Sequence, residues 1–191
     1  MEKQIDPRII RTRKLIMDAF IELSTKKDFK DITIKDITTN ATINRATFYS
    51  HFIDKFDLLD KVLSESIMKE VIQEVSKHEL INEETIQAIF LSIIKFQISL
   101  RNQCHRSYEA FTTQIETIFK QELQVFFAEI GKNQWSNQYI DVEASAVMLS
   151  WALYGAATHW LQNQNTQPED YVKQVVHFIK NGLKADKDTV S

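Results

Sequence analysis

Hydroxyl, basic and aromatic side chains are concentrated in the stretch TIKDITTNATINRATFYSHF, which spans Thr33–Phe52. When its last part is placed on a helix with about 100° per residue, Phe48 and Phe52 fall side by side and form an apolar anchor. Ala46 and Ser50 fall on the opposite side, and because both are small, that face can approach another surface closely. The spacing therefore predicts a short helix that is anchored at its back and bare at its front.

The side chains around this bare face have the chemistry of DNA recognition. Arg45 lies in the exposed first turn, where a guanidinium can donate two parallel hydrogen bonds to guanine. Thr47 and Tyr49 flank the face with hydroxyls that can reach phosphates on either side of a groove. Thr33 and Lys55 stand at the starts of the neighbouring helices, where free N–H groups favour phosphate. The pattern predicts a helix in the DNA major groove, although periodicity and charge alone also fit a helix that is simply part of the core.

Capping residues divide this part of the chain into short helices. Asp6, followed by Pro7, starts a first helix, which the polar run TKKDFKD at residues 25–31 ends. Thr33 and Asn44 cap a second and a third helix, and the short link TNATIN is right for a helix-turn-helix. Asp54 caps a fourth helix, which continues to about residue 78.

The periodicity of the remaining chain is also helical. Five further helices are expected over residues 82–100, 106–112, 114–130, 141–162 and 168–182, with Gly131 ending the seventh and a loop at 132–140. The chain has only three Gly and two Pro, which argues against an all-β fold with its many turns. We therefore expect an all-α fold of about nine helices. A helix-turn-helix domain at 1–55, with its motif at about 33–52, should precede a larger helical domain at 56–191.

Charge is unevenly distributed along the chain. Residues 1–61 carry 12 Lys/Arg and 10 Asp/Glu, whereas residues 62–191 carry 11 and 16. A modest basic excess on an acidic body suits a nucleic-acid surface, and equally a solvated helix face. Because Cys104 is the only cysteine and the N-terminus lacks a signal peptide's apolar core, we expect a cytoplasmic protein. The uncharged stretch 144–168 is too polar for a membrane span, so we expect a buried helix there.

The stretch RKLIMDAFIELSTKKDFKDITIKDITTNATINRATFYSHFIDKFDLLDKVL resembles the N-terminal DNA-binding domain of the TetR family of bacterial transcriptional regulators. Its most specific part is TFYSHFIDKFDLL, which follows the run T-[FL]-Y-x-H-F-x-x-K-x-x-L. The resemblance covers about residues 9–63, a third of the chain. It implies phosphate contacts from the hydroxyl, Tyr, His and Lys of the run and from the Thr that opens the second helix, and base contacts from the residues that open the third. The implied DNA-binding residues are Thr33, Asn44, Arg45, Ala46, Thr47, Tyr49, His51 and Lys55.

Two positions depart from the family pattern. The family commonly has Gly after the first helix and Gly in the turn, where this chain has Asp28 and Thr42. Asp tolerates a left-handed backbone fairly well, whereas a β-branched Thr does so poorly. The turn at Thr42 is therefore either right-handed or strained.

The resemblance also implies that the C-terminal domain forms a homodimer through its last two long helices and encloses a small-molecule pocket. The eighth helix combines small residues with large apolar ones, and a helix apolar over so much of its girth must be covered on several sides. We expect the interface to contain Gly155, Thr158, Tyr171, Val175, Phe178 and Ile179. The alternative is that both helices are internal core. Two identical heads should bind a palindromic operator with half-site centres about 34–36 Å apart or a multiple of it.

Aromatic residues on the body helices favour an apolar or aromatic effector. Most of them belong to the core, and a subset is expected to line the pocket: Phe90, Tyr108, Phe111, Phe126, Trp151 and Tyr154. Cys104 beside His105 could form a thiol sensor or bind a metal, but lone pairs of this kind seldom do, and no cluster has metal-ligand spacing. We expect neither a metal nor a cofactor.

The predicted function is a ligand-responsive repressor that binds a palindromic operator as a homodimer and is released by a small, largely apolar effector. The alternative is a transcriptional activator or co-regulator with the same head, whose body binds a protein partner through the loop that contains Trp135 and Tyr139. No nucleophile–base pair, nucleotide-binding glycine motif or metal site is evident, so the sequence does not predict an enzyme.

Overall fold

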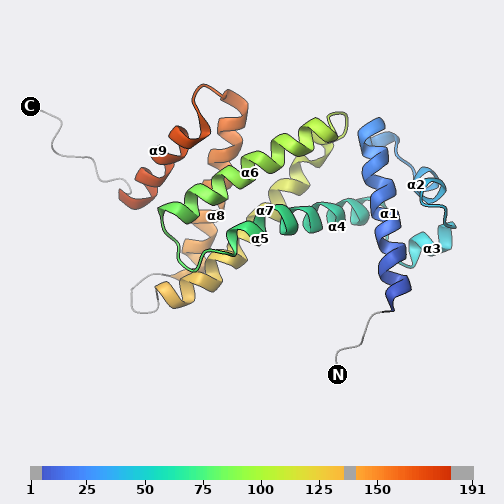
Figure 1. Ribbon diagram of the computed structural model, residues 1–191, viewed down its shortest axis with the longest axis horizontal. Helices are drawn as coiled ribbons and strands as arrows, with labels where there is room; N and C mark the ends of the chain where they lie inside the picture. Colours follow the sequence, from blue (N-terminus) through green and yellow to red (C-terminus); the bar gives the residue numbers. More distant parts are fainter. Residues whose placement is uncertain (1–5, 136–140, 182–191) are drawn as a thin grey trace, which may run out of the picture. The chain divides into compact units, whose positions relative to one another are not determined.

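The computed structural model describes residues 6–135 and 141–181, without the side chains of Met68 and Glu74. Within these ranges the chain has nine α-helices and no strand, which confirms the all-α prediction (Figure 1). The helices are α1 (Pro7–Lys26), α2 (Ile34–Asn40), α3 (Arg45–Tyr49), α4 (Lys55–Ile67), α5 (Gln73–Val75), α6 (Glu83–Gln103), α7 (Tyr108–Gln134), α8 (Val142–Asn163) and α9 (Pro168–Asn181). A 3-10 helix, η1 (Phe29–Asp31), and a π-helix, η2 (Met68–Ile72), complete them.

The chain divides into two compact units. The head unit combines Met1–Ser66 with Ile98–Ile118, and the body unit combines Ile67–Gln97 with Phe119–Ser191. The end of α6 and the first part of α7 therefore belong with the N-terminal helices. The domain limits 1–55 and 56–191 remain a prediction.

Side-chain caps define the helix starts of the head unit, as the sequence predicts. The Asp6 carboxylate accepts a hydrogen bond from the Arg8 N–H at 2.8 Å, with Pro7 as the first residue of α1. Asn44 accepts from the N–H of Thr47 at 2.7 Å. Asp54 accepts from the N–H groups of Phe56 and Asp57, both at 2.8 Å. These short-range bonds satisfy N–H groups that have no partner within the helix.

Aromatic rings from distant parts of the sequence form the core of the head unit. Phe29 of η1 lies with its ring centroid 6.1 Å from that of Phe20 on α1 and 5.6 Å from that of Phe111 on α7. Phe20 and Phe111 are themselves 6.4 Å apart, and all three are at most 5% exposed. Such edge-on and tilted pairs add to the stability that burial provides. The core thus attaches the start of α7 to the N-terminal helices.

The turn between α2 and α3 is left-handed at Thr42, where φ is 54°. The N–H of Ile43 donates to the carbonyl of Thr38 at 3.0 Å, and the N–H of Thr42 donates to that of Thr39 at 3.2 Å. This pair of bonds is the Schellman motif, which usually places Gly at the left-handed position. The first of the two alternatives, a right-handed turn, is therefore wrong, and Thr42 carries strain. Asp28 is extended instead, with φ −63°.

Three expected helix limits are wrong. The third helix ends at Tyr49 rather than near Phe52, and η2 interrupts the fourth. The expected sixth and seventh helices form one continuous α7, in which Gly131 is an interior residue. A Cβ at Gly131 would lie 2.6 Å from the Trp135 ring, so this glycine makes room for a side chain one turn later instead of ending the helix. Tyr139 and most of the expected loop lie outside the described residues.

Stacked aromatic rings connect three helices of the body unit. The Tyr171 ring on α9 stacks on Phe90 of α6 at 5.8 Å and on His159 of α8 at 6.0 Å. Asp141 caps α8 by accepting from the Ala144 N–H at 3.0 Å, and this helix starts where the sequence predicted it. No helix in the described part of the chain is long and apolar enough to span a bilayer.

Candidate nucleic-acid interface

Helix α3 is anchored from behind by two buried rings. Phe48 is 0% exposed and Phe52, just beyond the helix, is 2% exposed, with their ring centroids 5.9 Å apart. The guanidinium of Arg13 on α1 lies 4.8 Å from the centre of the Phe52 ring, which ties the anchor to the first helix. Ala46 and Ser50, on the other side of α3, are exposed. The structure therefore gives α3 a rigid back and an open front.

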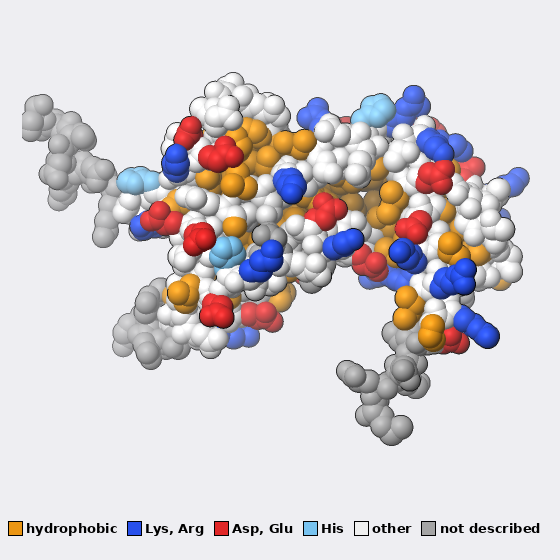
Figure 2. Space-filling view, viewed as in Figure 1, with side chains coloured by type: hydrophobic (Ala, Val, Ile, Leu, Met, Phe, Trp, Pro, Cys, Tyr) orange, Lys and Arg blue, Asp and Glu red, His pale blue; other side chains and the backbone are white. Residues whose placement is uncertain are grey.

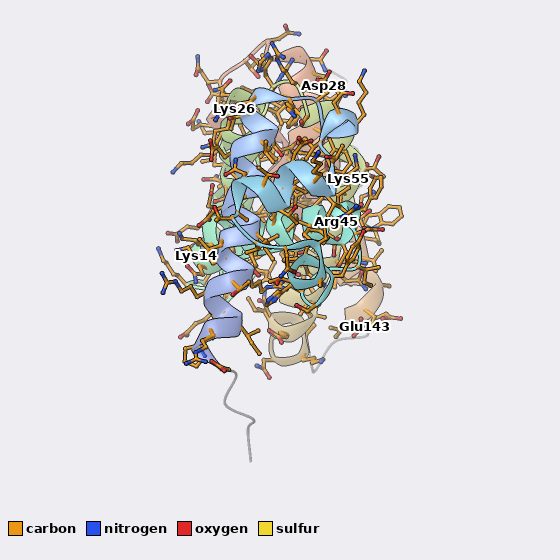
Figure 3. All side chains as sticks on the ribbon, turned by 90° about the vertical axis from the view of Figure 1, so that its right-hand side faces the viewer. Lys14, Lys26, Asp28, Arg45, Lys55 and Glu143 are labelled. Atoms are coloured by element: carbon orange, nitrogen blue, oxygen red, sulfur yellow. The ribbon has the colours of Figure 1, made fainter. Side chains whose placement is uncertain are left out.

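The residues at the start of α3 leave one cation free at the surface. Asn44 uses its side-chain oxygen for the N–H of Thr47, at 2.7 Å, and for the Thr47 hydroxyl, at 3.0 Å. Arg45 is exposed, and within the described residues its guanidinium makes no hydrogen bond or ion pair (Figure 3). A guanidinium in this state can bind a base edge without first breaking a bond. Tyr49 is 52% exposed and turns its ring edge-on to Phe48, with 5.5 Å between centroids.

The start of α2 is closed by a reciprocal capping box. The Thr33 N–H and hydroxyl donate to Asp36 Oδ2 at 2.9 and 2.8 Å, and the Asp36 N–H donates back to Thr33 Oγ1 at 3.1 Å. The pKa of the Asp36 carboxyl is lowered to about 2. The hydrogen bond from the Thr33 N–H contributes most, followed by the bond from the Thr33 hydroxyl and by the neighbouring Lys27 ammonium. The box is consequently intact at neutral pH.

The start of α4 contains two carboxylates and one fully engaged ammonium. Asp54 caps the helix, and Asp57 accepts from the Ile53 N–H at 2.9 Å. Lys55 directs its Nζ to backbone carbonyls of the α1–α2 connection. His51, half-buried after α3, has its ring centroid 6.4 Å from that of Phe52. Thr33, Tyr49, His51 and Lys55 thus all lie in the head unit with α3.

Basic side chains also lie along the first half of α1. Arg8, Arg11 and Lys14 are exposed there, and Figure 2 shows the Lys and Arg side chains gathered over this end of the helix. Positive charge at the surface raises the affinity for any phosphate backbone.

The turn between α6 and α7 reaches the end of α1, a contact that the sequence did not predict. The Ser107 hydroxyl donates to the Lys27 carbonyl at 2.9 Å, and Arg106 donates to the Lys26 carbonyl at 3.4 Å. Gln114 donates to Asp60 on α4 at 2.7 Å. Ser107 is 0% exposed although it follows the polar residues His105 and Arg106, so no periodicity in the sequence points to its burial.

The six residues predicted to line an effector pocket divide between the two units. Tyr108 and Phe111 belong to the head unit, and Phe111 packs in its core. Phe90, Phe126 and Tyr154 are buried in the body unit, whereas Trp151 is 56% exposed, with the Lys120 ammonium 4.2 Å from its ring centre. A cavity of about 250 Å³ in the body unit is lined by residues of η2 and α6: Glu70, Ser92, Lys95 and Phe96.

The residues predicted for a dimer interface lie on or near the surface of the body unit. Gly155 and Phe178 are exposed, and no atom lies within 4 Å of where a Gly155 Cβ would be. Thr158, Tyr171, Val175 and Ile179 are half-buried. Exposed positions of α8 also share one helical stripe: Ala144, Met148, Trp151, Ala152, Gly155 and His159. This apolar stripe lies on the helix that the sequence predicted to pair.

Metal and thiol chemistry gain no support in the described part of the chain. No group of three or more His, Cys, Asp or Glu side chains occurs there in an arrangement that could hold a metal ion. Cys104 is 3% exposed, and burial raises the pKa of its thiol.

An anchored short helix after a tight turn, on a larger helical body, defines a helix-turn-helix protein. Residues 16–62 match the family described as "Bacterial regulatory proteins, tetR family". The HTH-type transcriptional regulator YxbF of Bacillus subtilis (strain 168) is 47% identical over 66 residues, which are 34% of this chain and 17% of that protein. The chain thus matches about a sixth of the length of this relative.

Two solved structures share the fold over most of their length. The TetR transcriptional regulator from Streptococcus agalactiae is 22% identical with a TM-score of 0.57, and the match covers 91% of this chain and 96% of that one. The transcriptional regulator FadR from Bacillus subtilis, in complex with stearoyl-CoA, is 16% identical with a TM-score of 0.55 and coverages of 90% and 99%. Residues 16–62 thus match the DNA-binding part of the TetR family, as the sequence predicted. The matching family model and the YxbF relative both describe transcriptional regulators, in line with the prediction that the chain is not an enzyme.

Proposed function

We propose that this protein is a ligand-responsive transcriptional repressor that binds a palindromic operator as a homodimer. The observation that carries the proposal is the open front of α3, where Ala46 and Ser50 are exposed beside the free guanidinium of Arg45. In a major groove, Arg45 would donate to a guanine, and Asn44 and Ala46 would lie against neighbouring base edges. The rigid back formed by Phe48 and Phe52 would hold this geometry.

Phosphate contacts would surround the bases on both sides. Thr47, Tyr49 and His51 would contact phosphates on either side of the groove. The starts of α2 at Thr33 and of α4 at Lys55 would hold phosphates through backbone N–H groups that the Asp36 and Asp54 carboxylates do not engage. Affinity should then fall steeply with salt, because each neutralised phosphate releases counterions.

A second copy of the chain is the proposed partner of the α8 stripe. Met148 is 71% exposed and Trp151 56%, and Phe178 on α9 is 57% exposed. Large apolar side chains gathered on one face indicate an interaction surface rather than a solvated one. Two copies related by a two-fold axis would cover the same face on each other and would place two heads on one palindrome.

The proposed effector is small and largely apolar. The cavity beside Phe96 has a volume of about 250 Å³, below the usual range for drug-sized ligands, and Lys95 and Glu70 provide charges at its wall. The FadR neighbour, whose structure is a complex with stearoyl-CoA, supports the proposal of an apolar effector. The effector would release the operator only if it binds the DNA-incompetent state more tightly than the competent one.

A selection from random duplex DNA with the full chain tests the proposal. We expect an enriched palindrome, a footprint on it, and a mass near twice 22.3 kDa by light scattering. An unenriched library contradicts DNA recognition, and a monomer at micromolar concentration contradicts the dimer. The alternative, an activator or co-regulator whose body binds a protein, would be favoured if operator binding did not respond to any small molecule while a reporter gene was activated.

A further inference from the structure

The side chain of Lys55 is fully engaged inside the head unit. Its Nζ donates to the carbonyl oxygens of Phe29 at 2.9 Å, Lys30 at 3.2 Å and Ile32 at 3.0 Å. An ammonium has three N–H donors and no acceptor, so these carbonyls use its whole capacity. The centres of two aromatic rings also lie near Nζ, that of Phe29 at 4.6 Å and that of Phe56 at 5.8 Å.

The three carbonyls belong to the segment that leads directly into α2. Ile32 is the residue before Thr33, which caps α2, and Lys55 is the first residue of α4. One ammonium therefore joins the starts of the two helices that are proposed to hold phosphates on the two sides of α3. Figure 3 shows Lys55 on α4 and Asp28, which marks this segment between α1 and α2.

A phosphate contact by this ammonium would come at the expense of these bonds. Hydrogen bonds from a charged donor are about twice as strong as neutral ones, and the carbonyls of Phe29 and Ile32, whose bonds to Lys55 are partly buried, would lose their donor. Exposed cations, such as Arg45 on α3 and Lys35 in the first turn of α2, can reach DNA without such a loss.

We propose that the Lys55 ammonium is a positioning group, which fixes the starts of α2 and α4 relative to each other, and that it does not contact DNA itself. This inference rests on the proposed DNA binding. Any phosphate contact at the start of α4 would then be made by the backbone N–H groups of this helix. The connection between α1 and α2 is then held from two sides, by Lys55 and by the turn at Arg106 and Ser107.

Lys55→Arg separates positioning from phosphate contact. Arginine keeps the charge and binds phosphate well, but its planar fork cannot direct three donors from one atom to three converging carbonyls. We expect Lys55→Arg and Lys55→Met to lower the melting temperature by about 5 °C or more, and both to weaken binding about tenfold or more on every duplex. The probes are sonicated calf-thymus DNA and a duplex selected by the wild-type chain.

The salt dependence of binding provides the second measurement. The slope of log K against log salt, between about 50 and 200 mM, should be the same in Lys55→Met as in the wild type, because the variant neutralises the same phosphates. Lys35→Met is the matched comparison, because it removes an exposed lysine from the first turn of α2, whose start is proposed to hold a phosphate. We expect its slope to fall by about 0.9 for each phosphate that is no longer neutralised, while its melting temperature stays unchanged.

Two results would overturn the inference. One is a Lys55→Arg protein whose melting temperature equals that of the wild type and whose affinity for DNA is within about twofold of the wild-type affinity, as expected if Lys55 were a phosphate ligand. The other is a slope in Lys55→Met that falls by about 0.9 per head. If Lys55→Met does not fold, that supports positioning, since a lysine that acts only on DNA does not stabilise the free protein, and Lys55→Arg then supplies the binding data. A wild-type chain that enriches no duplex and does not bind calf-thymus DNA refutes the proposed function instead, while the melting comparison still tests the role of Lys55.

Discussion

Replacing Thr42 with glycine should stabilise the protein, because the backbone of Thr42 is left-handed, with φ 54°. The left-handed conformation costs an L-residue about 1–2 kcal/mol, and a β-branched side chain lies at the upper end of that range. Glycine avoids this cost but loses about 0.5–1 kcal/mol more conformational freedom on folding. The net expectation for Thr42→Gly is a gain of about 0.5–1 kcal/mol in the free energy of unfolding.

The folded structure loses nothing else in this substitution. Thr42 is exposed, and no hydrogen bond of its hydroxyl is recorded within the described residues. Its N–H donates to Thr39, and this backbone bond survives in the glycine variant. For a chain of this length the gain corresponds to a rise of about 1–4 °C in melting temperature, measurable by calorimetry or circular dichroism.

Gln164 provides the matched control. It also has a positive φ, 45°, at the end of α8, but its side chain is not β-branched. Gln164→Gly should therefore bring no gain in stability, because the added chain entropy and the loss of the exposed hydrogen bond from the Gln164 side chain to the Leu161 carbonyl, at 3.2 Å, offset the relief of strain. If Thr42→Gly melts at or below the wild-type temperature, or if both variants gain equal stability, the β-branched side chain of Thr42 does not strain the turn.

Three further outcomes follow from the described contacts. Arg45→Ala should cost about 1–3 kcal/mol at a single base pair, measured by competition among singly substituted operators, and an equal loss on every operator would show that Arg45 contacts only phosphate. Met148→Asp should convert the dimer into monomers by placing a charge in the α8 stripe, as seen by light scattering; an unchanged mass would place the interface elsewhere. Asp36→Asn should lower the melting temperature at pH 7 but not near pH 2. The native pKa of about 2 lies below the ordinary 3.8, so the stability that the carboxylate supplies is full above about pH 4 and disappears as the pH falls through 2. A difference in melting temperature between Asp36→Asn and the wild type that persists unchanged at pH 2 would refute this role of the Asp36 carboxylate.

The features of the head that the sequence predicted are local ones. The caps at Asp6, Thr33, Asn44 and Asp54 act over two or three residues, so their chemistry is visible in the sequence. The pairing of Phe48 with Phe52 follows from helix periodicity alone. The family match of residues 16–62 could be predicted for the same reason, because its most specific residues lie in one continuous run.

Gly131 shows where local reasoning fails. A glycine near the expected end of a helix is most simply a stop, yet here it admits the Trp135 ring inside α7. The sequence showed both residues but not that the ring folds back over the preceding turn. The handedness of the turn at Thr42 was undecided for a similar reason: its energy is unfavourable locally and is set by the packing of α2 and α3 around it.

The sequence by itself determined the helical class, the helix starts of the head, the bare front of α3 and the family match of residues 16–62, because these depend on contacts within a few residues. Only the tertiary structure decided what Lys55 and Ser107 do. Their carbonyl partners lie about 25 and 80 residues away, and backbone carbonyls carry no mark in the sequence. A lysine in a DNA-binding run has the same letter whether its ammonium faces a phosphate or three carbonyls, and the difference arises only when distant segments of the chain are brought together.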